Sequence, residues 1–194
     1  MSVSLRCYST SLGCPKNRVD TERLLGSLGV ALVPVESPDE AELVFINTCA
    51  FIQPATEESV RTIAQAIADI EELPKRPLLA VAGCLVGRYH AEDLAPELPE
   101  VDLWLDNSDL EAWPAMLARK LGLPEPTVPG RILSTGPSYA WLKISDGCRH
   151  ACSFCAIPNI RGGHRSHCKD MIVREARALL DQGVKELNLV AQDL

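Results

Sequence analysis

The run LVFIN at residues 43–47 decides the fold, because it is apolar at every position but the last. Continuous apolar character over so short a stretch is typical of a strand buried on both faces of a parallel sheet. The run LLAVA at residues 78–82 has the same character. Between the two, residues 55–73 place apolar side chains at helical spacing. A strand, a helix and a second strand in this order predict an α/β fold with helices on the faces of a parallel sheet.

The same alternation continues on both sides of this unit. Strands are expected at residues 3–9, 31–35 and 103–105, and helices at residues 17–28, 89–94 and 110–121. Asn17 is expected to cap the first of these helices and Gly29 to end it, since both residue types favour those positions. Residues 1–122 are therefore predicted to form one N-terminal parallel-sheet α/β domain.

Residues 123–138 are rich in proline and glycine, which predicts a linker. Beyond it we expect a strand at residues 139–144, a long irregular loop, a helix at residues 170–182 and a strand at residues 186–190. Parallel strands need neighbours on both sides to close a core. Residues 139–194 are therefore expected to be the truncated start of a larger second domain.

The composition excludes several classes of protein. Of the 194 residues, 46% are hydrophobic and 23% are charged, which excludes intrinsic disorder. The net charge of −7 disfavours a general binder of nucleic acid or of an anionic membrane surface. No apolar run approaches the roughly 18 residues of a membrane span, and no secretory signal is visible. We therefore expect a cytoplasmic protein.

Eight cysteines are unusual for a chain without an export signal, because thiols clustered in a reducing compartment more often bind metal or do chemistry. Cys148, Cys152 and Cys155 fall within eight residues, so they can surround one metal centre. Zinc would take a fourth ligand from one of the nearby histidines. An iron–sulfur cluster fits better, since cysteine thiolates are its usual ligands and three of them leave one iron open.

A second group of cysteines is spread along the chain. Cys14, Cys49 and Cys84 each follow a predicted strand, at intervals of 35 residues. The carboxyl ends of parallel strands lie at one edge of the sheet, so the three thiols are expected to converge there. If they converge, a second three-thiolate cluster is the natural occupant; the alternative is three unrelated buried thiols.

The spacing of Cys148, Cys152 and Cys155, with Phe154 just before the last of them, resembles the signature of the radical S-adenosylmethionine (SAM) superfamily. The resemblance implies a 4Fe–4S cluster whose open iron binds the amino and carboxylate groups of SAM. One electron from the cluster would split SAM into a radical that abstracts hydrogen from an unreactive carbon. Phe154 would lie against the adenine.

Both cysteine groups together resemble the methylthiotransferase family of radical SAM enzymes, over nearly the whole chain. The motifs SLGCPKN at 11–17, NTCAFI at 47–52, KISDGC at 143–148 and RGGHRS at 161–166 are closest to the class that modifies a ribosomal-protein aspartate. The class that modifies tRNA adenosine is the alternative within the family. A zinc or redox-cysteine protein with a structural or binding role is the alternative outside it.

The resemblance implies two 4Fe–4S clusters, the second held by Cys14, Cys49 and Cys84 and presenting the sulfur to be inserted. The substrate would be an aspartate of the small-subunit ribosomal protein twelve, modified on its β-carbon. An electron donor such as flavodoxin or ferredoxin is implied as a partner. Residues 139–194 would begin a radical SAM partial (β/α) barrel, and the truncated chain alone is expected to be inactive.

The remaining candidates surround the second cysteine loop. Residues 139–169 hold five basic residues and one acidic residue, a cationic setting that suits an anionic cluster. The residues expected to contact SAM or the substrate are Phe154, Arg161, Arg165, Gln192 and Asp193. Cys168 is interpreted as an incidental thiol, Cys7 as a core residue, and the four histidines as surface residues.

Overall fold

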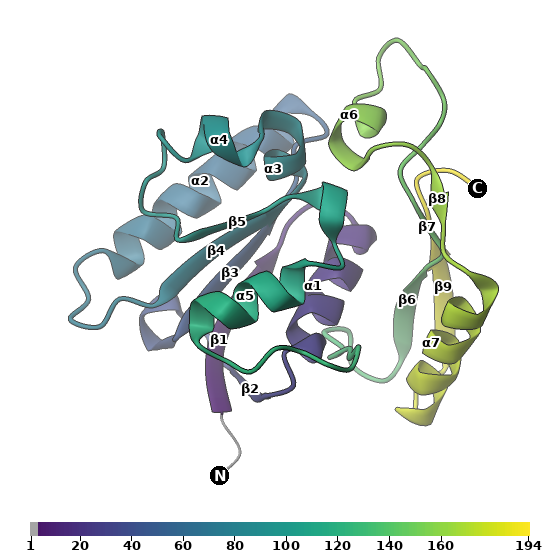
Figure 1. The fold of residues 1–194 in the computed structure, drawn as a ribbon, viewed down its shortest axis with the longest axis horizontal. Coiled ribbons are helices and arrows are strands. Elements are labelled where there is room, and N and C mark those ends of the chain that lie inside the picture. Colours follow the sequence, from purple (N-terminus) through teal and green to yellow (C-terminus); the bar gives the residue numbers. More distant parts are fainter. Residues whose placement is uncertain (1–3) are drawn as a thin grey trace.

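The computed structural model describes residues 4–194 and opens with a five-stranded parallel sheet (Figure 1). Its strands follow the order β2-β1-β3-β4-β5. Their bounds are β1 Ser4–Ser11, β2 Ala31–Pro34, β3 Leu43–Thr48, β4 Leu78–Gly83 and β5 Leu103–Leu105. The predicted α/β class with a parallel sheet is confirmed.

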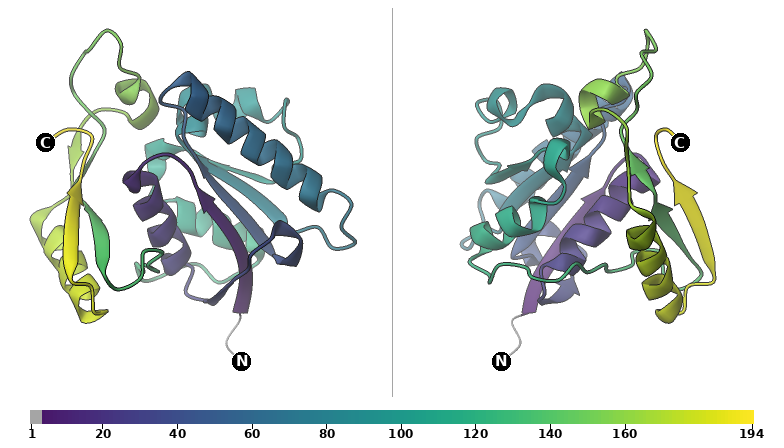
Figure 2. Two further views of the ribbon diagram at one scale, coloured as in Figure 1. Left: turned by 180° about the vertical axis from the view of Figure 1, so that it is seen from behind. Right: turned by 45° about the vertical axis from the view of Figure 1, so that its right-hand side comes forward.

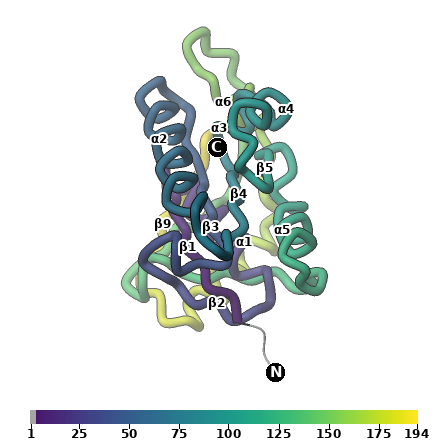
Figure 3. Tube along the Cα trace, turned by 90° about the vertical axis from the view of Figure 1, so that its left-hand side faces the viewer, coloured from purple at the N-terminus to yellow at the C-terminus, as the bar shows by residue number. Residues whose placement is uncertain are grey.

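Helices cover both faces of this sheet, α1 and α5 on one face and α2, α3 and α4 on the other (Figure 3). Their bounds are α1 Pro15–Ser27, α2 Gln53–Ile70, α3 Cys84–Tyr89, α4 Ala91–Leu94 and α5 Trp113–Leu121. Two short 3-10 turns, η1 Pro38–Glu40 and η2 Asn107–Asp109, complete this part. Across residues 4–194, none of the helices combines the length and the apolar character that crossing a membrane requires.

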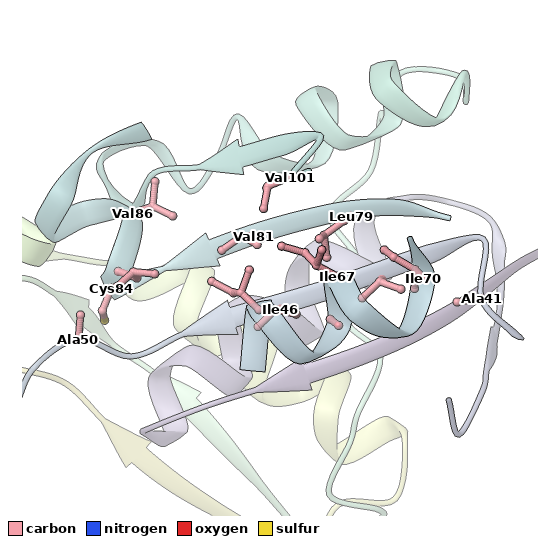
Figure 4. Packing of buried hydrophobic residues seen from close by; sticks show 14 of the residues in the cluster. Ala41, Ile46, Ala50, Ile67, Ile70, Leu79, Val81, Cys84, Val86 and Val101 are labelled. Atoms are coloured by element: carbon pink, nitrogen blue, oxygen red, sulfur yellow. The ribbon is translucent and has the colours of Figure 1, made fainter. Parts of the chain in front are cut away.

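The core is divided by the sheet because successive side chains of a strand point to opposite faces. In β3, Val44 and Ile46 pack with the α2 side, whereas Leu43 and Phe45 pack with the α1 and α5 side. Figure 4 shows the α2 side, where Cys84 lies at one end of the apolar cluster. All six residues of β3 are buried, as expected for a strand covered on both faces.

The helix boundaries differ from the prediction, most clearly at the start of α1 and in α3 and α4. α1 begins at Pro15 with Cys14 as its extended N-cap, so Asn17 lies inside the first turn and caps nothing. Proline explains the earlier start, because its fixed φ and missing N–H suit the first helical position. The single helix predicted at residues 89–94 is two short helices, α3 and α4, separated at His90 with a φ of 60°.

The second part of the chain pairs β6 (Tyr139–Lys143) in parallel with β9 (Glu186–Val190), and α7 (Lys169–Asp181) packs on them (Figure 2). The segment expected to be an irregular loop contains α6 (Ile157–Arg161) and an antiparallel pair, β7 (Ser145–Asp146) with β8 (Arg165–Ser166). The described residues of this part contribute two parallel strands, so the predicted partial barrel remains a prediction.

The segment at residues 123–138 lies against α1. A Cβ added to Gly26 of α1 would lie 2.4 Å from the backbone nitrogen of Arg131, and the Ile132 N–H donates to the Glu22 carbonyl. On its other side α1 packs on the sheet, and it also contacts β6. α1 is therefore the element on which both parts of the chain meet.

Candidate functional site

Three cysteines lie at the carboxyl edge of the five-stranded sheet. Cys14 follows β1, Cys49 follows β3, and Cys84 begins α3 directly after β4. The strand order reverses between β1 and β3, and ligands of open α/β sheets bind outside the carboxyl ends of strands at such a reversal. The first cysteine group therefore occupies the position in this fold where a ligand is expected.

The three thiols converge, as the position of their strands predicted. The Cys49 and Cys84 thiols interact directly, and Cys14 is near enough to act electrostatically on Cys49. The hydrogen bond between the two thiols, and then burial, raise the pKa of Cys49. The same hydrogen bond lowers the pKa of Cys84 to about 6, and the charge of Arg161 adds to this effect against burial. One thiol of the pair is therefore disposed to ionise.

Two glycines let the cysteine loops approach one another. Gly13 has a φ of +81°, and a Cβ there would lie 2.7 Å from the Cys49 sulfur. Gly83 has a φ of +99°, and a Cβ there would lie 2.6 Å from the Thr48 carbonyl oxygen. Both turns therefore need glycine for their conformation, Gly13 also for the space beside the Cys49 thiol and Gly83 for the space beside Thr48.

Buried polar side chains tie the three cysteine loops together. The Asn17 amide donates to the Leu12 carbonyl at 2.9 Å and to the Thr48 carbonyl at 2.8 Å, which joins the loops after β1 and β3. The Thr48 hydroxyl donates to the Ala82 carbonyl at 2.6 Å and accepts from the Leu85 N–H, which joins β3 to the turn after β4. These side-chain hydrogen bonds thus hold the three cysteine loops in fixed positions relative to one another.

Helix α2 fixes Cys49 from the opposite side. The Ser59 hydroxyl donates to the Cys49 carbonyl at 2.7 Å and accepts from the Cys49 N–H at 3.0 Å, and Ser59 is fully buried. Arg88 of α3 donates to the Ala50 carbonyl at 2.6 Å. Hydrogen bonds from both α2 and α3 therefore fix the backbone of the motif that contains Cys49.

The second cysteine group lies on the exposed loop before α6. Cys148 and Cys155 are half-buried and Cys152 is exposed. The Cys148 sulfur accepts from the His150 N–H at 3.5 Å, and the Cys148 N–H donates to the Gly162 carbonyl. The loop thus starts at a fixed point beside Gly162 and presents Cys152 to solvent.

Two residues after β9 lie beside this loop. β6 and β9 are parallel, so the loops that follow their carboxyl ends lie at the same edge. Within residues 4–194, Cys148, His150 and Asp193 form the one group of three possible metal ligands whose atoms all lie within 4.8 Å of one another. The Gln192 side-chain oxygen is buried and has no hydrogen-bond partner in the described residues.

The spacing of the cysteines bears on which metal centre they fit. Among the described residues, the three sulfur atoms of neither cysteine trio all lie within 4.8 Å of one another, the spacing that a single metal ion requires. A four-iron cluster is larger than one ion, so its thiolate ligands stand farther apart. A set made only of thiols, with Gly13 clearing the space beside Cys49, fits such a cluster better than a single ion. The assignment of either trio as a cluster ligand remains a prediction.

The other predicted contacts of SAM or substrate are placed differently. The Phe154 side chain is 89% exposed, on the same loop as the second cysteine group. Arg165 is exposed, and its guanidinium lies 3.5 Å from the Ser108 carbonyl of the first part. Arg161, by contrast, is buried and points to α1 rather than to solvent.

A buried charge network connects α1 with the second part of the chain. Arg161 lies 2.8 Å from Asp20 and 3.6 Å from Asp146. Lys143 pairs with both Asp20 and Asp146, and His167 lies 3.2 Å from Asp146. Burial alone would raise the pKa of Asp146, but the His167 hydrogen bond and the Lys143 charge outweigh it and lower that pKa.

Sequence reasoning missed Asp20 and Lys143 in this network. The signal for Lys143 was present, because a lysine at the end of an otherwise apolar strand needs a buried partner. The sequence predicts a surface position for His167, but its side chain is only 18% exposed. Cys7 is a buried core residue, and burial raises the pKa of its thiol to about 12. Cys168 is exposed at the N-cap of α7.

Comparison with known proteins identifies relatives over almost the whole chain. A model of the family described as "Uncharacterized protein family UPF0004" matches residues 6–106, which is more than half of the chain. This range contains Cys14, Cys49 and Cys84.

Curated relatives share the name "Ribosomal protein uS12 methylthiotransferase RimO". The chain is 71% identical over 187 residues to that protein from Nitratidesulfovibrio vulgaris (strain DP4), covering 96% of the chain and 44% of the relative. It is 64% identical to the protein from Oleidesulfovibrio alaskensis, with the same coverage. It is 50% identical to the protein from Aquifex aeolicus, covering 94% of the chain and 40% of the relative. The chain thus spans less than half the length of these relatives.

Proposed function

Since the chain belongs to the UPF0004 family, we propose that its protein is a radical SAM methylthiotransferase that adds a methylthio group to an aspartate of ribosomal protein uS12. The name that the relatives share states the activity and the substrate. The modified atom would be the aspartate β-carbon. An electron donor such as flavodoxin or ferredoxin would supply the reducing electron.

The convergence of the Cys14, Cys49 and Cys84 loops is the observation that carries this proposal. A parallel sheet brings three thiols from distant motifs to one edge, and Gly13 keeps the space beside Cys49 open. Three thiolates on a four-iron cluster leave one iron without a protein ligand. That open position is suited to the sulfur atom that the reaction inserts.

The second cysteine loop would hold the cluster that binds SAM. A 4Fe–4S cluster with SAM supplies a radical able to abstract the unactivated hydrogen of an aspartate β-carbon. Cys148, Cys152 and Cys155 would hold that cluster, and Phe154 would stack on the adenine. Gln192 and Asp193, at the carboxyl end of β9, would line the SAM pocket.

The division of the chain follows from these roles. Residues 1–122 would form the domain that holds the first cysteine trio, and residues 139–194 would begin the radical SAM partial barrel. Residues 123–138 would connect the two. The contacts of Arg131 with α1 support a connection that is fixed rather than free.

Iron and sulfide analysis of the anaerobically reconstituted protein tests the two-cluster proposal. We expect about eight iron atoms per chain, because each cluster holds four. Replacing Cys148, Cys152 and Cys155 by alanine should remove about half of the iron. Replacing Cys14, Cys49 and Cys84 should remove the other half. Retention of all iron after either triple replacement would contradict the assignment.

Incubation of the reconstituted protein with SAM, a reductant and purified uS12 tests whether uS12 is the substrate. Mass spectrometry of uS12 should show one aspartate that has gained a methylthio group in place of hydrogen. A tRNA arm in the same assay separates the two classes of the family. Modification of tRNA adenosine without modification of uS12 would contradict the proposed substrate.

A zinc site is the second candidate, because Cys148, His150 and Asp193 offer three ligands within 4.8 Å. Sulfur, imidazole and carboxylate are ligands that zinc accepts. This candidate predicts one zinc per chain, no visible absorbance, and loss of the metal from a His150→Ala variant. The iron–sulfur proposal instead predicts a brown protein whose colour the His150→Ala variant keeps.

A further inference from the structure

We propose that the buried positive charge of Arg161 raises the reduction potential of the cluster held by Cys14, Cys49 and Cys84. This inference rests on the proposed function, because it concerns one of the two clusters. Arg161 belongs to the second part of the chain, six residues beyond Cys155, the last cysteine of the other trio. Its guanidinium nevertheless reaches Asn17, which lies beside Cys84 of the first part.

The backbone places Arg161 beside the first cysteine group. Arg161 ends α6, and α6 packs on α3, which begins with Cys84. The two helices are in close contact, because a Cβ added to Gly87 of α3 would lie 2.4 Å from the Ile160 carbonyl oxygen. The Arg161 side chain is 2% exposed, so its charge is screened little by solvent.

Asn17 connects the guanidinium to the cysteine. Arg161 Nη2 donates to Asn17 Oδ1, and this oxygen lies 3.8 Å from the Cys84 sulfur. Arg161 Nη1 donates to Asp20 at 2.8 Å, which fixes the guanidinium against α1.

The charge balance of the buried network makes the direction of the effect predictable. Arg161 and Lys143 oppose Asp20 and Asp146, so the four charges cancel. Without Arg161 the network carries a net negative charge next to Cys84. The reduction potential of an iron–sulfur cluster depends on nearby charge and on hydrogen bonds to its sulfurs. An added negative charge disfavours reduction and lowers the potential.

Asp20 supplies a test with the opposite sign. Asp20→Asn has nearly the same shape but removes a negative charge from the same network, so it should raise the potential. A purely structural role for the ion pair predicts that either replacement loosens the same contact and moves the potential in the same direction. Opposite shifts therefore distinguish an electrostatic role from a structural one.

The experiment uses the complete protein with Cys148, Cys152 and Cys155 replaced by alanine, so that only the first cluster is present. A redox titration followed by electron paramagnetic resonance measures its midpoint potential. Arg161→Gln should lower the midpoint, Asp20→Asn should raise it, and the double variant should lie between them. Arg177→Gln, which removes an exposed arginine of α7, should leave it unchanged.

If the glutamine variant loses the cluster, a second comparison is needed. Arg161→Lys, which keeps the charge, supplies it. Its midpoint should lie closer to the parent than that of Arg161→Met. Equal midpoints for the lysine and methionine variants, or shifts of the same sign for Arg161→Gln and Asp20→Asn, would overturn the inference. A parent without about four iron atoms overturns the proposed cluster itself, and the inference with it.

Discussion

Arg131 Nη2 lies 2.7 Å from Oε2 of Glu22, and both side chains are almost fully buried. Arg131 comes from the proline-rich segment at residues 123–138, and Glu22 comes from α1. Arg131 Nη1 also lies 2.8 Å from Glu175 of α7. One arginine therefore joins the segment, the first part and the second part, which fixes a stretch whose composition predicted only a linker.

Arg131→Met should destabilise the protein by about 3–5 kcal/mol, because it leaves the buried Glu22 carboxylate without its cation. Methionine retains the apolar stem, so the loss reports the charge and its hydrogen bonds. Chemical denaturation measures the free energy of unfolding. Arg119→Met, on an exposed arginine of α5, is the control and should change it by less than about 0.5 kcal/mol. Equal effects of the two replacements would contradict the anchoring role.

Glu175 should contribute stability that depends on pH. Burial alone would raise the pKa of Glu175, but the hydrogen bonds and charges of Arg23 and Arg131 outweigh it and lower that pKa in the folded state. A lowered folded pKa gives stability that is present above the unfolded pKa, about 4.3, and is lost as the pH falls through the folded value.

Comparison of the parent with Glu175→Gln isolates this contribution. The difference in unfolding free energy between the two proteins should be constant near pH 7 and should shrink as the pH falls below about 4.3. Glu125→Gln, an exposed position, should give no such difference. A Glu175→Gln difference that does not change between pH 7 and pH 3 would show that the Glu175 charge does not stabilise the fold.

The first cysteine site was predictable from sequence because it depends on topology. Residues 43–47 and 78–82 identify buried parallel strands by composition alone, and parallel strands end at a common edge. Cysteines placed just after those strands are therefore expected at one edge of the sheet, and they meet there because β1, β3 and β4 are neighbours. The order β2-β1-β3-β4-β5 was not predictable in this way, since pairing between strands leaves no local pattern.

The charge network around Asp20 was not predictable. Asp20 and Lys143 are 123 residues apart in sequence, and Asp20 and Arg161 are 141 apart. From sequence, an aspartate on a helix is expected to be exposed to solvent, and only the fold shows that a second part of the chain covers it. Arg161 was expected to contact SAM on the basis of its distance from the cysteine loop in sequence. Its buried position next to Asn17 and Cys84 depends on how α6 packs on α3.

Gly83→Ala should damage the first cysteine site more than the second. Gly83 has φ 99° and ψ −154°, a region that only glycine adopts readily, and an added Cβ would lie 2.2 Å from Asn47 Oδ1. We expect a loss of about 2–5 kcal/mol in stability, combining backbone strain with a clash. Iron should fall from about eight to about four atoms per chain, because the turn that presents Cys84 moves.

Gly29→Ala is the matched control for Gly83. It also has a positive φ, of 68°, but an added Cβ there meets nothing within 4 Å. It should cost only about 1–2 kcal/mol for the left-handed conformation and should leave the iron content unchanged. Loss of iron in both variants to the same extent would show that backbone strain, rather than the clash with Asn47 and Thr48, limits the site.

Phe154→Ala should separate a binding role from a structural one. The side chain is 89% exposed, so its removal should change the free energy of unfolding by less than about 0.5 kcal/mol. If the ring stacks on adenine, SAM binding should weaken on the order of tenfold, since stacking on a base contributes about 1–3 kcal/mol. Equilibrium binding of SAM to the reconstituted protein measures this effect. Val128→Ala, which truncates another exposed apolar residue, should leave SAM affinity unchanged, and an equally small effect of Phe154→Ala would refute the stacking role.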